Sequence, residues 1–281
     1  MLPPDMQSAM LPCTMCRGQK RAAEGNDGGI KYWWILPFLS FFFSLNNQSF
    51  WIDECCTALC AMQQGMEGCW KKICEIGGSD AQMAFYYYLL FLWHHLTGAE
   101  SEWMLRLFNI FWVFLSSWFF RKEPKALVIL LISPFFVYYS NELRPYMLQI
   151  AASCAVSMLF WQVSRGEPVK FHVFFGSLFF LCLTSLTGVV WALGFAAAFM
   201  VMAFRQFGGR RFRRALLWWI FPFSGLGAYY LYTLFLGARA VSISSSWIVN
   251  ACASMYELSG LAGMGPSRLE LRMCMTPDAL W

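Results

Sequence analysis

The segment Ser49–Ala61, SFWIDECCTALCA, places an acidic pair, Asp53 and Glu54, shortly after an apolar run that ends at Leu45. Because carboxylates are costly within hydrocarbon, we expect this pair to lie outside the lipid, at the surface of a membrane. It is then either a solvated loop end or the catalytic edge of a membrane enzyme whose lipid-linked substrate reaches that surface. A dipeptide specifies no chemistry by itself, so the rest of the chain has to decide between the two.

The composition is that of a protein embedded in a membrane. Hydrophobic residues make up 58% of the chain, aromatic residues 19% and charged residues 13%, with a mean hydropathy of +0.48. The apolar share is well above that of a soluble domain, and the charged share is below it. Lys and Arg retained in cytoplasmic loops account for the net charge of +5, so no nucleic-acid partner is needed.

The placement of basic residues predicts how the chain crosses the membrane. The segments Arg121–Lys125, Arg165–Lys170 and Arg205–Arg214 all fall on the side of the basic N-terminus if Ala84–Leu96 lies in the interface instead of crossing. The seven spans predicted on this basis are Tyr32–Leu45, Trp103–Phe120, Ala126–Ser140, Tyr146–Val163, Phe171–Leu183, Val189–Phe204 and Ala215–Leu236.

The predicted fold class is therefore all-α, a polytopic transmembrane helix bundle of about seven spans. Interfacial helices are expected in the first extracytoplasmic loop, where Cys55–Trp70 mixes apolar and polar residues. A turn is expected at Thr184–Gly188, because the apolar run around it is too long for one crossing. We divide the chain into a disordered cytoplasmic tail at 1–31, a transmembrane catalytic module at 32–236, and an extracytoplasmic or re-entrant tail at 237–281.

A second charged group emerges on the same face as Asp53, in the loop Ser140–Arg144, SNELR. Glu142 and Arg144 lie two residues apart, so in an extended loop their side chains point the same way. Arg144 offers a planar fork for a phosphate, and Glu142 offers a second carboxylate. The alternative is a local ion pair that caps the next span. Arg106, near the start of its own span, is either a phosphate ligand or a snorkelling anchor.

Cysteines are frequent around the acidic pair. The five that follow it are Cys55, Cys56, Cys60, Cys69 and Cys74. They are able to form disulfides if their loop faces an oxidising compartment, although the sequence does not pair them. Cys13 and Cys16 have the CxxC spacing of a metal or redox site, but the second half of a zinc site is missing.

Three motifs stand out on the predicted extracytoplasmic face. They are Trp51–Glu54 (WIDE), the tyrosine run Tyr86–Tyr88 followed by Gly98–Arg106 (GAESEWMLR), and Ser133–Tyr146 (SPFFVYYSNELRPY). In this order they resemble the GT-C glycosyltransferases, in particular the bacterial family 39 and aminoarabinose-transferase-like (protein-mannosyltransferase-like) members that use polyprenyl-phosphate sugars. The third motif is similar to the family's S-P-x-x-x-Y-Y-S-x-E-x-R-x-Y pattern nearly residue for residue. Gln82–Ala84 departs from the family, whose members often carry prolines before the tyrosines.

The resemblance implies an enzyme of the bacterial inner membrane, multi-pass, with its active face extracytoplasmic. It would move a sugar from a polyprenyl-phosphate donor to a lipid, glycan or protein acceptor, with membrane lipid around it. Asp53 would be the catalytic carboxylate, with Glu54 to orient it, bind the acceptor or help to hold Mg or Mn. The residues expected to bind the donor phosphate or the acceptor are Glu142, Arg144, Tyr146, Arg106 and Asp80. Family members usually continue into more spans, so a shortened C-terminal region is expected here.

Two other classes stay open. A transporter or flippase of lipid-linked substrates also surrounds polar loops with apolar spans, but its usual marks are paired repeats and ionisable groups at mid-membrane. The charges of this chain gather at the ends of the predicted spans instead. A catalytically inactive remnant of the family is the third class, suggested by the missing prolines and the early end of the chain.

Overall fold

The computed structural model describes residues 33–45, 52–77, 80–167, 169–206 and 209–236, and every regular element within these ranges is a helix. The all-α class predicted from the sequence is therefore confirmed. The elements are α2 (Ile35–Ser44), α3 (Ile52–Ala61), α4 (Gly65–Ile76), the 3-10 helix η2 (Asp80–Met83), α5 (Ala84–Thr97), α6 (Glu102–Arg106), α7 (Asn109–Phe119), α8 (Pro124–Ile132), α9 (Pro134–Asn141), α10 (Tyr146–Ser164), α11 (Phe171–Thr184), α12 (Leu186–Gln206) and α13 (Gly209–Leu236). The tails predicted at 1–31 and 237–281 lie outside the described residues.

Helix length alone does not establish seven spans. Among the described helices, α10 meets the length and hydropathy of a membrane crossing, while α2, α11 and Leu186–Met202 of α12 are apolar but shorter. Two of the predicted spans are each divided into two helices, α6 with α7 and α8 with α9. The second break falls at Ser133, which is extended at ψ 125° because the following residue is Pro134.

The segment 52–76, predicted from the sequence to belong to the first extracytoplasmic loop, forms a helical hairpin of α3 and α4. Asp53 and Glu54 lie in the first turn of α3, where the positive end of the helix dipole favours acidic side chains. The predicted interfacial stretch Cys55–Trp70 is divided into α3 and α4 by a turn before Gly65, whose φ of +77° suits a glycine. The acidic pair is thus held on a helix and not on a free loop.

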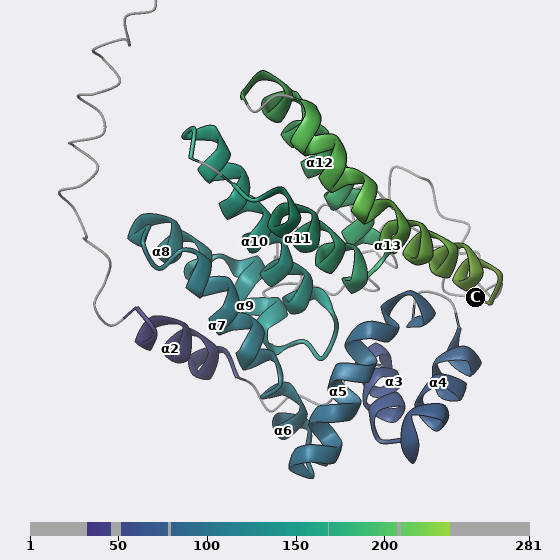
Figure 1. The fold of residues 1–281 in the computed structure, drawn as a ribbon. Coiled ribbons are helices and arrows are strands. Elements are labelled where there is room, and N and C mark those ends of the chain that lie inside the picture. Colours follow the sequence, from purple (N-terminus) through teal and green to yellow (C-terminus); the bar gives the residue numbers. More distant parts are fainter. Residues whose placement is uncertain (1–32, 46–51, 78–79, 168, 207–208, 237–281) are drawn as a thin grey trace, which may run out of the picture.

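The helices of the bundle alternate in direction, so their connections gather at two opposite ends (Figure 1). We call the end with Arg121, Lys122 and Arg165 the basic end, and the opposite end, with α3 to α6, the acidic end. At the basic end Arg165 Nη1 lies 3.2 Å from Glu123 Oε1, which joins the α7–α8 and α10–α11 connections. The two basic segments predicted to share one side of a membrane therefore do lie together.

Three apolar clusters hold these helices. Tyr86, Tyr87 and Leu90 of α5 are fully buried against α3 and α4, and Leu143 and Leu148 join this cluster to the bundle. A second cluster packs α10 to α13, and a third packs α2 with α7, α8 and α9. The helices of the acidic end are therefore packed onto the bundle through the α9–α10 connection and the start of α10, and also against α11 and α13.

The turn between α11 and α12 lies within the predicted range Thr184–Gly188 and contains a close approach. A Cβ on Gly188 would lie 2.3 Å from the carbonyl oxygen of Leu181 and 2.6 Å from Thr184 Oγ1. Both distances are too short for a Cβ atom, and the contact with Leu181 can be relieved only by moving backbone, so this glycine is required by space and not by its dihedral angles.

We expect Gly188→Ala to lower the free energy of unfolding by about 1–3 kcal/mol, because the added methyl group forces α11 and α12 apart. The measurement is the thermal unfolding midpoint of the full chain. Gly194→Ala in the same helix is the matched control, since its Cβ would meet nothing within 4 Å. Equal midpoints for the two variants would contradict the close packing of this turn.

Candidate functional site

A buried ion pair lies at the centre of the acidic end. Glu54 Oε2 of α3 is 3.1 Å from Arg106 Nη2 of α6, and the two side chains are 2% and 4% exposed. Glu54 Oε1 also accepts a hydrogen bond of 2.7 Å from the backbone N–H of Leu143. One carboxylate therefore connects α3, α6 and the loop that carries Glu142 and Arg144.

A second ion pair lies beside the first. Arg144 Nη1 is 2.8 Å from Asp80 Oδ1 of η2, with the arginine side chain 4% and the aspartate 13% exposed. The Tyr87 hydroxyl donates to Asp80, and it accepts hydrogen bonds from Arg144 Nη1 at 3.1 Å and from Thr57 Oγ1 at 3.4 Å. Because burial raises the pKa of Tyr87 well above its ordinary value, its hydroxyl stays protonated and remains a donor to Asp80.

Arg144 is a cation of this site with a hydrogen-bond donor still available for a ligand. Burial opposes its charge, but Tyr87 and Asp80 more than offset this, so its pKa lies above the ordinary value and the guanidinium stays charged. Its Nε is buried and has no hydrogen-bond partner in the described part of the chain. Such a group is costly to leave unsatisfied, which fits a position that a bound anion completes.

Asp53 lies next to this arginine but faces solvent. Its backbone carbonyl accepts hydrogen bonds from Thr57 Oγ1 at 2.9 Å and, weakly, from Arg144 Nη1 at 3.5 Å. Its exposed carboxylate makes no hydrogen bond or ion pair with the described residues. The pKa of the nearby Cys56 thiol is raised mainly by burial, then by the charge of Asp80, and to a smaller extent by the charge of Asp53. A carboxylate that is accessible and beside a fixed cation is free to accept a proton from a ligand.

Uncharged groups also hold the chain on either side of Arg144, in addition to the Glu54 carboxylate bound to Leu143. The backbone oxygen of Glu142 accepts a 2.7 Å hydrogen bond from Asn109 Nδ2, and the Tyr86 hydroxyl donates to Asn109 Oδ1 at 3.1 Å. Tyr146 begins α10 and packs its ring against Tyr139, with ring centroids 4.8 Å apart. These contacts leave the loop few alternative conformations, which keeps Arg144 in place.

All seven residues predicted from the sequence gather at the acidic end. The structure joins Glu54 to Arg106 and Asp80 to Arg144, two pairings that their spacing in the sequence did not suggest. Arg106 is buried against Glu54 and not snorkelling at an edge, so its role as a phosphate ligand stays a prediction. The described residues contain no group of three or more His, Cys, Asp or Glu side chains that could hold a metal ion, and the suggested Mg or Mn stays a prediction.

Sequence reasoning overlooked two polar residues of this network. Asn109 stands alone in the apolar run Leu107–Val113, and a lone amide in such a run is a usable signal because it has to find a partner. Thr57 carries no comparable signal, since threonine is common near helix starts. Both act by holding backbone or hydroxyl groups in place and not by carrying charge.

Four cysteines of α3 and α4 are free thiols in the described part of the chain: Cys56, Cys60, Cys69 and Cys74. Burial raises the pKa of Cys60 to about 12 and that of Cys69 to about 11, whereas Cys55 is exposed. The two buried thiols are therefore protonated and apolar in character at neutral pH. The disulfides considered from the sequence would require an oxidising compartment, which stays a prediction.

The fold and the site together define an all-helical protein with paired buried charges at one end of a helix bundle. Comparison with known proteins finds no family model, no curated protein and no solved structure that matches the chain. The resemblance to glycosyltransferases therefore rests on the motifs themselves.

We expect Glu54→Gln to cost about 3–5 kcal/mol of unfolding free energy, because it leaves the Arg106 charge buried without a counter-charge. Asp53→Asn, one residue earlier but exposed, should change stability by less than about 0.5 kcal/mol. Chemical denaturation of the full chain measures both. The double variant Glu54→Gln with Arg106→Gln should recover part of the loss, and equal costs for the 53 and 54 variants would contradict the buried pair.

Proposed function

We propose that this protein is a membrane glycosyltransferase that moves a sugar from a polyprenyl-phosphate donor to an acceptor at the extracytoplasmic membrane surface. The observation that carries the proposal is the carboxylate of Asp53, which is exposed, makes no ion pair with the described residues and lies beside the charged guanidinium of Arg144. Sugar transfer from a phosphate-linked donor needs a base for the acceptor and a cation for the departing phosphate. The motif resemblance points to the same two residues.

In the proposed reaction Asp53 takes the proton of an acceptor hydroxyl as its oxygen attacks the anomeric carbon. The bond from that carbon to the phosphate oxygen breaks, and the polyprenyl phosphate leaves with both electrons of the bond. Arg144 stabilises the charge that develops on the phosphate, and a planar guanidinium is well suited to this role. Glu54 and Arg106 act in this scheme as positioning residues, because they hold α3 against the loop that carries Arg144.

The membrane location is supported by the surface of the bundle. Large apolar side chains are widely exposed, among them Phe43 at 87%, Phe221 at 86% and Trp218 at 73%. Soluble monomers rarely leave contiguous apolar surface uncovered, and lipid would cover it here. At the basic end Arg121 stacks over Trp118 at 3.7 Å and Arg165 over Trp161 at 4.7 Å, an arrangement typical of a membrane interface.

The divided helices are compatible with the proposed crossings. The pairs α6 with α7 and α8 with α9 each cover nearly the length of α10, which has 19 residues. A helical path of that length spans about 30 Å, the thickness of the hydrocarbon core. A flippase or transporter would place ionisable groups at mid-helix, whereas the charged residues of α7 to α11 lie at the helix ends. This distribution favours surface chemistry.

We expect Asp53→Asn to lower sugar transfer by about 10²- to 10⁴-fold, because the amide no longer accepts the acceptor proton. The assay uses membranes that carry the full chain, supplied with radiolabelled polyprenyl-phosphate sugars. Glu67→Gln is the matched control, since Glu67 is an exposed carboxylate paired with Lys71 on α4. Arg144→Lys keeps the charge but loses the fork, so it should weaken use of the donor more than of the acceptor.

The proposal fails if Asp53→Asn retains the transfer rate of an active parent protein. It also fails if no polyprenyl-phosphate sugar is used by the parent, in which case an inactive remnant or a flippase becomes the better interpretation. A vesicle assay of lipid translocation distinguishes these two.

The proposed orientation puts the acidic end outside the cytoplasm. In a Cys-free background, we expect a membrane-impermeant thiol reagent added to intact cells to label Gln64→Cys, which lies in the exposed turn before α4. The same reagent should not label Lys122→Cys at the basic end until the membrane is opened. The reverse pattern would contradict the orientation, and labelling of both positions in intact cells would contradict a membrane between the two ends.

A further inference from the structure

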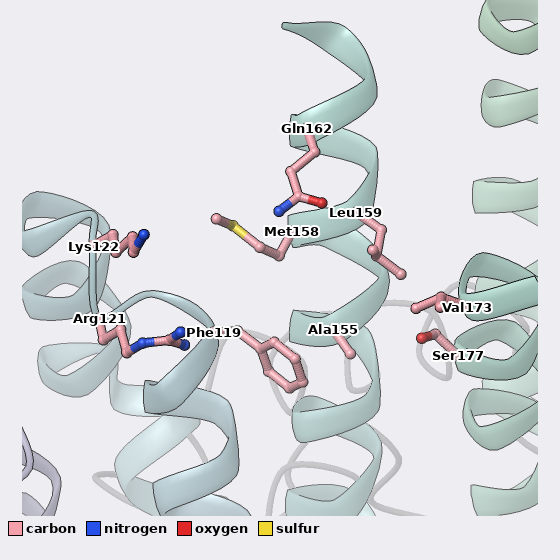
Figure 2. Close-up of a pocket in the computed structure, with 9 residues that line it drawn as sticks. All are labelled: Phe119, Arg121, Lys122, Ala155, Met158, Leu159, Gln162, Val173 and Ser177. Carbon is pink, nitrogen blue, oxygen red and sulfur yellow. The ribbon is translucent and has the colours of Figure 1, made fainter. Parts of the chain in front are cut away.

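A second site lies at the basic end, opposite the site that contains Asp53 and Arg144 (Figure 1). A cavity of about 260 Å³ opens between the end of α7, the last turns of α10 and the start of α11. Figure 2 shows Arg121 and Lys122 approaching from the α7 side, Met158 and Gln162 projecting from α10, and Ser177 on α11. The site thus combines side chains from three helices.

The rim of this cavity is cationic. Arg121 donates from Nη1 to the carbonyl oxygen of Trp118 at 2.9 Å and stacks over that ring, which fixes its position and leaves its other donors available. Lys122 is exposed and has no ion-pair partner within the described ranges. The neighbouring acid, Glu123, pairs with Arg165 and so does not neutralise Lys122. Two basic side chains therefore line the cavity, and no acidic residue is among its lining residues.

The interior of the cavity has the opposite character. Its walls include Phe119, Ala155, Met158 and Leu159, and its polar groups are the Gln162 amide toward the opening and the Ser177 hydroxyl. A free inorganic anion would use the rim and leave these apolar walls uncovered. A ligand with an anionic head and an apolar chain matches both parts of the cavity at once.

We propose that this cavity binds an anionic phospholipid, with the headgroup phosphate on Arg121 and Lys122 and the start of an acyl chain along Phe119, Ala155 and Met158. Basic pockets between helices at the cytoplasmic side of a bundle commonly bind such headgroups. The proposal rests on the membrane location and not on sugar transfer. Helices α7 and α10 begin at the acidic end with Asn109 and Tyr146 and end beside this cavity. A lipid bound here would therefore stabilise the opposite ends of the two helices that carry these residues.

The test is native mass spectrometry of the full chain in detergent, titrated with phosphatidylglycerol or with phosphatidylcholine of the same acyl chains. We expect the unmodified protein to bind phosphatidylglycerol at least fivefold more tightly. Each cation near an anionic headgroup contributes about fivefold in affinity, so Arg121→Gln with Lys122→Gln should remove most of this preference. Ala155→Phe fills the interior without changing charge, and should weaken binding of both lipids.

Lys125→Gln with Lys170→Gln is the matched control, because it removes two exposed cations at the same end but outside the cavity. This variant should keep the preference for phosphatidylglycerol. The proposal is overturned if the control loses the preference as fully as the cavity variant, or if the unmodified protein shows no preference. It is also overturned if millimolar inorganic phosphate displaces phosphatidylglycerol completely, which would indicate a site for the free anion.

Discussion

The arrangement of the acidic end depends on the buried contact between Glu54 and Arg106. Removing two charges from water is costly, and the cost is offset here because the carboxylate is met by a guanidinium and by the N–H of Leu143. Since these three groups come from α3, α6 and the loop before α10, the contact sets where that loop can lie. The position of Arg144, and with it the Asp80 pair, follows from this constraint.

Neighbouring residues on a helix can serve different purposes because they point about 100° apart. Asp53 and Glu54 are an example, since one carboxylate is in solvent and the next is 2% exposed. Tyr86 and Tyr87 of α5 are both buried, but their hydroxyls also reach different partners, Asn109 and Asp80. Rigid support and an accessible reactive group are thereby combined within one helical turn, which is a condition for a preorganised site.

The two ends of the bundle differ in charge, and this difference follows from the order and direction of the helices. Helices that alternate in direction bring every second connection to the same end (Figure 1). The basic segments at Arg121 and Arg165 therefore meet at one end, while Glu54 and Asp80 lie at the other. Large apolar side chains are exposed along several helices of the bundle. This polarity is the common basis of the proposed orientation, the proposed transferase site and the proposed lipid site, and each of them is open to a separate test.

The sequence by itself determined the helical class, the position of the α11–α12 turn, and which charged residues would lie together at one end. These follow from local properties: apolar runs of a certain length, glycine and serine at a turn, and charged residues placed at the ends of the apolar runs. The sequence could not determine that Glu54 pairs with Arg106, that Arg144 pairs with Asp80, or that Ser133 and Leu107 divide two predicted spans. It also did not reveal that Arg121 and Lys122 border an apolar cavity. Those features depend on the distance and angle between helices far apart in the chain, which are set by how whole side-chain surfaces pack and not by any local pattern.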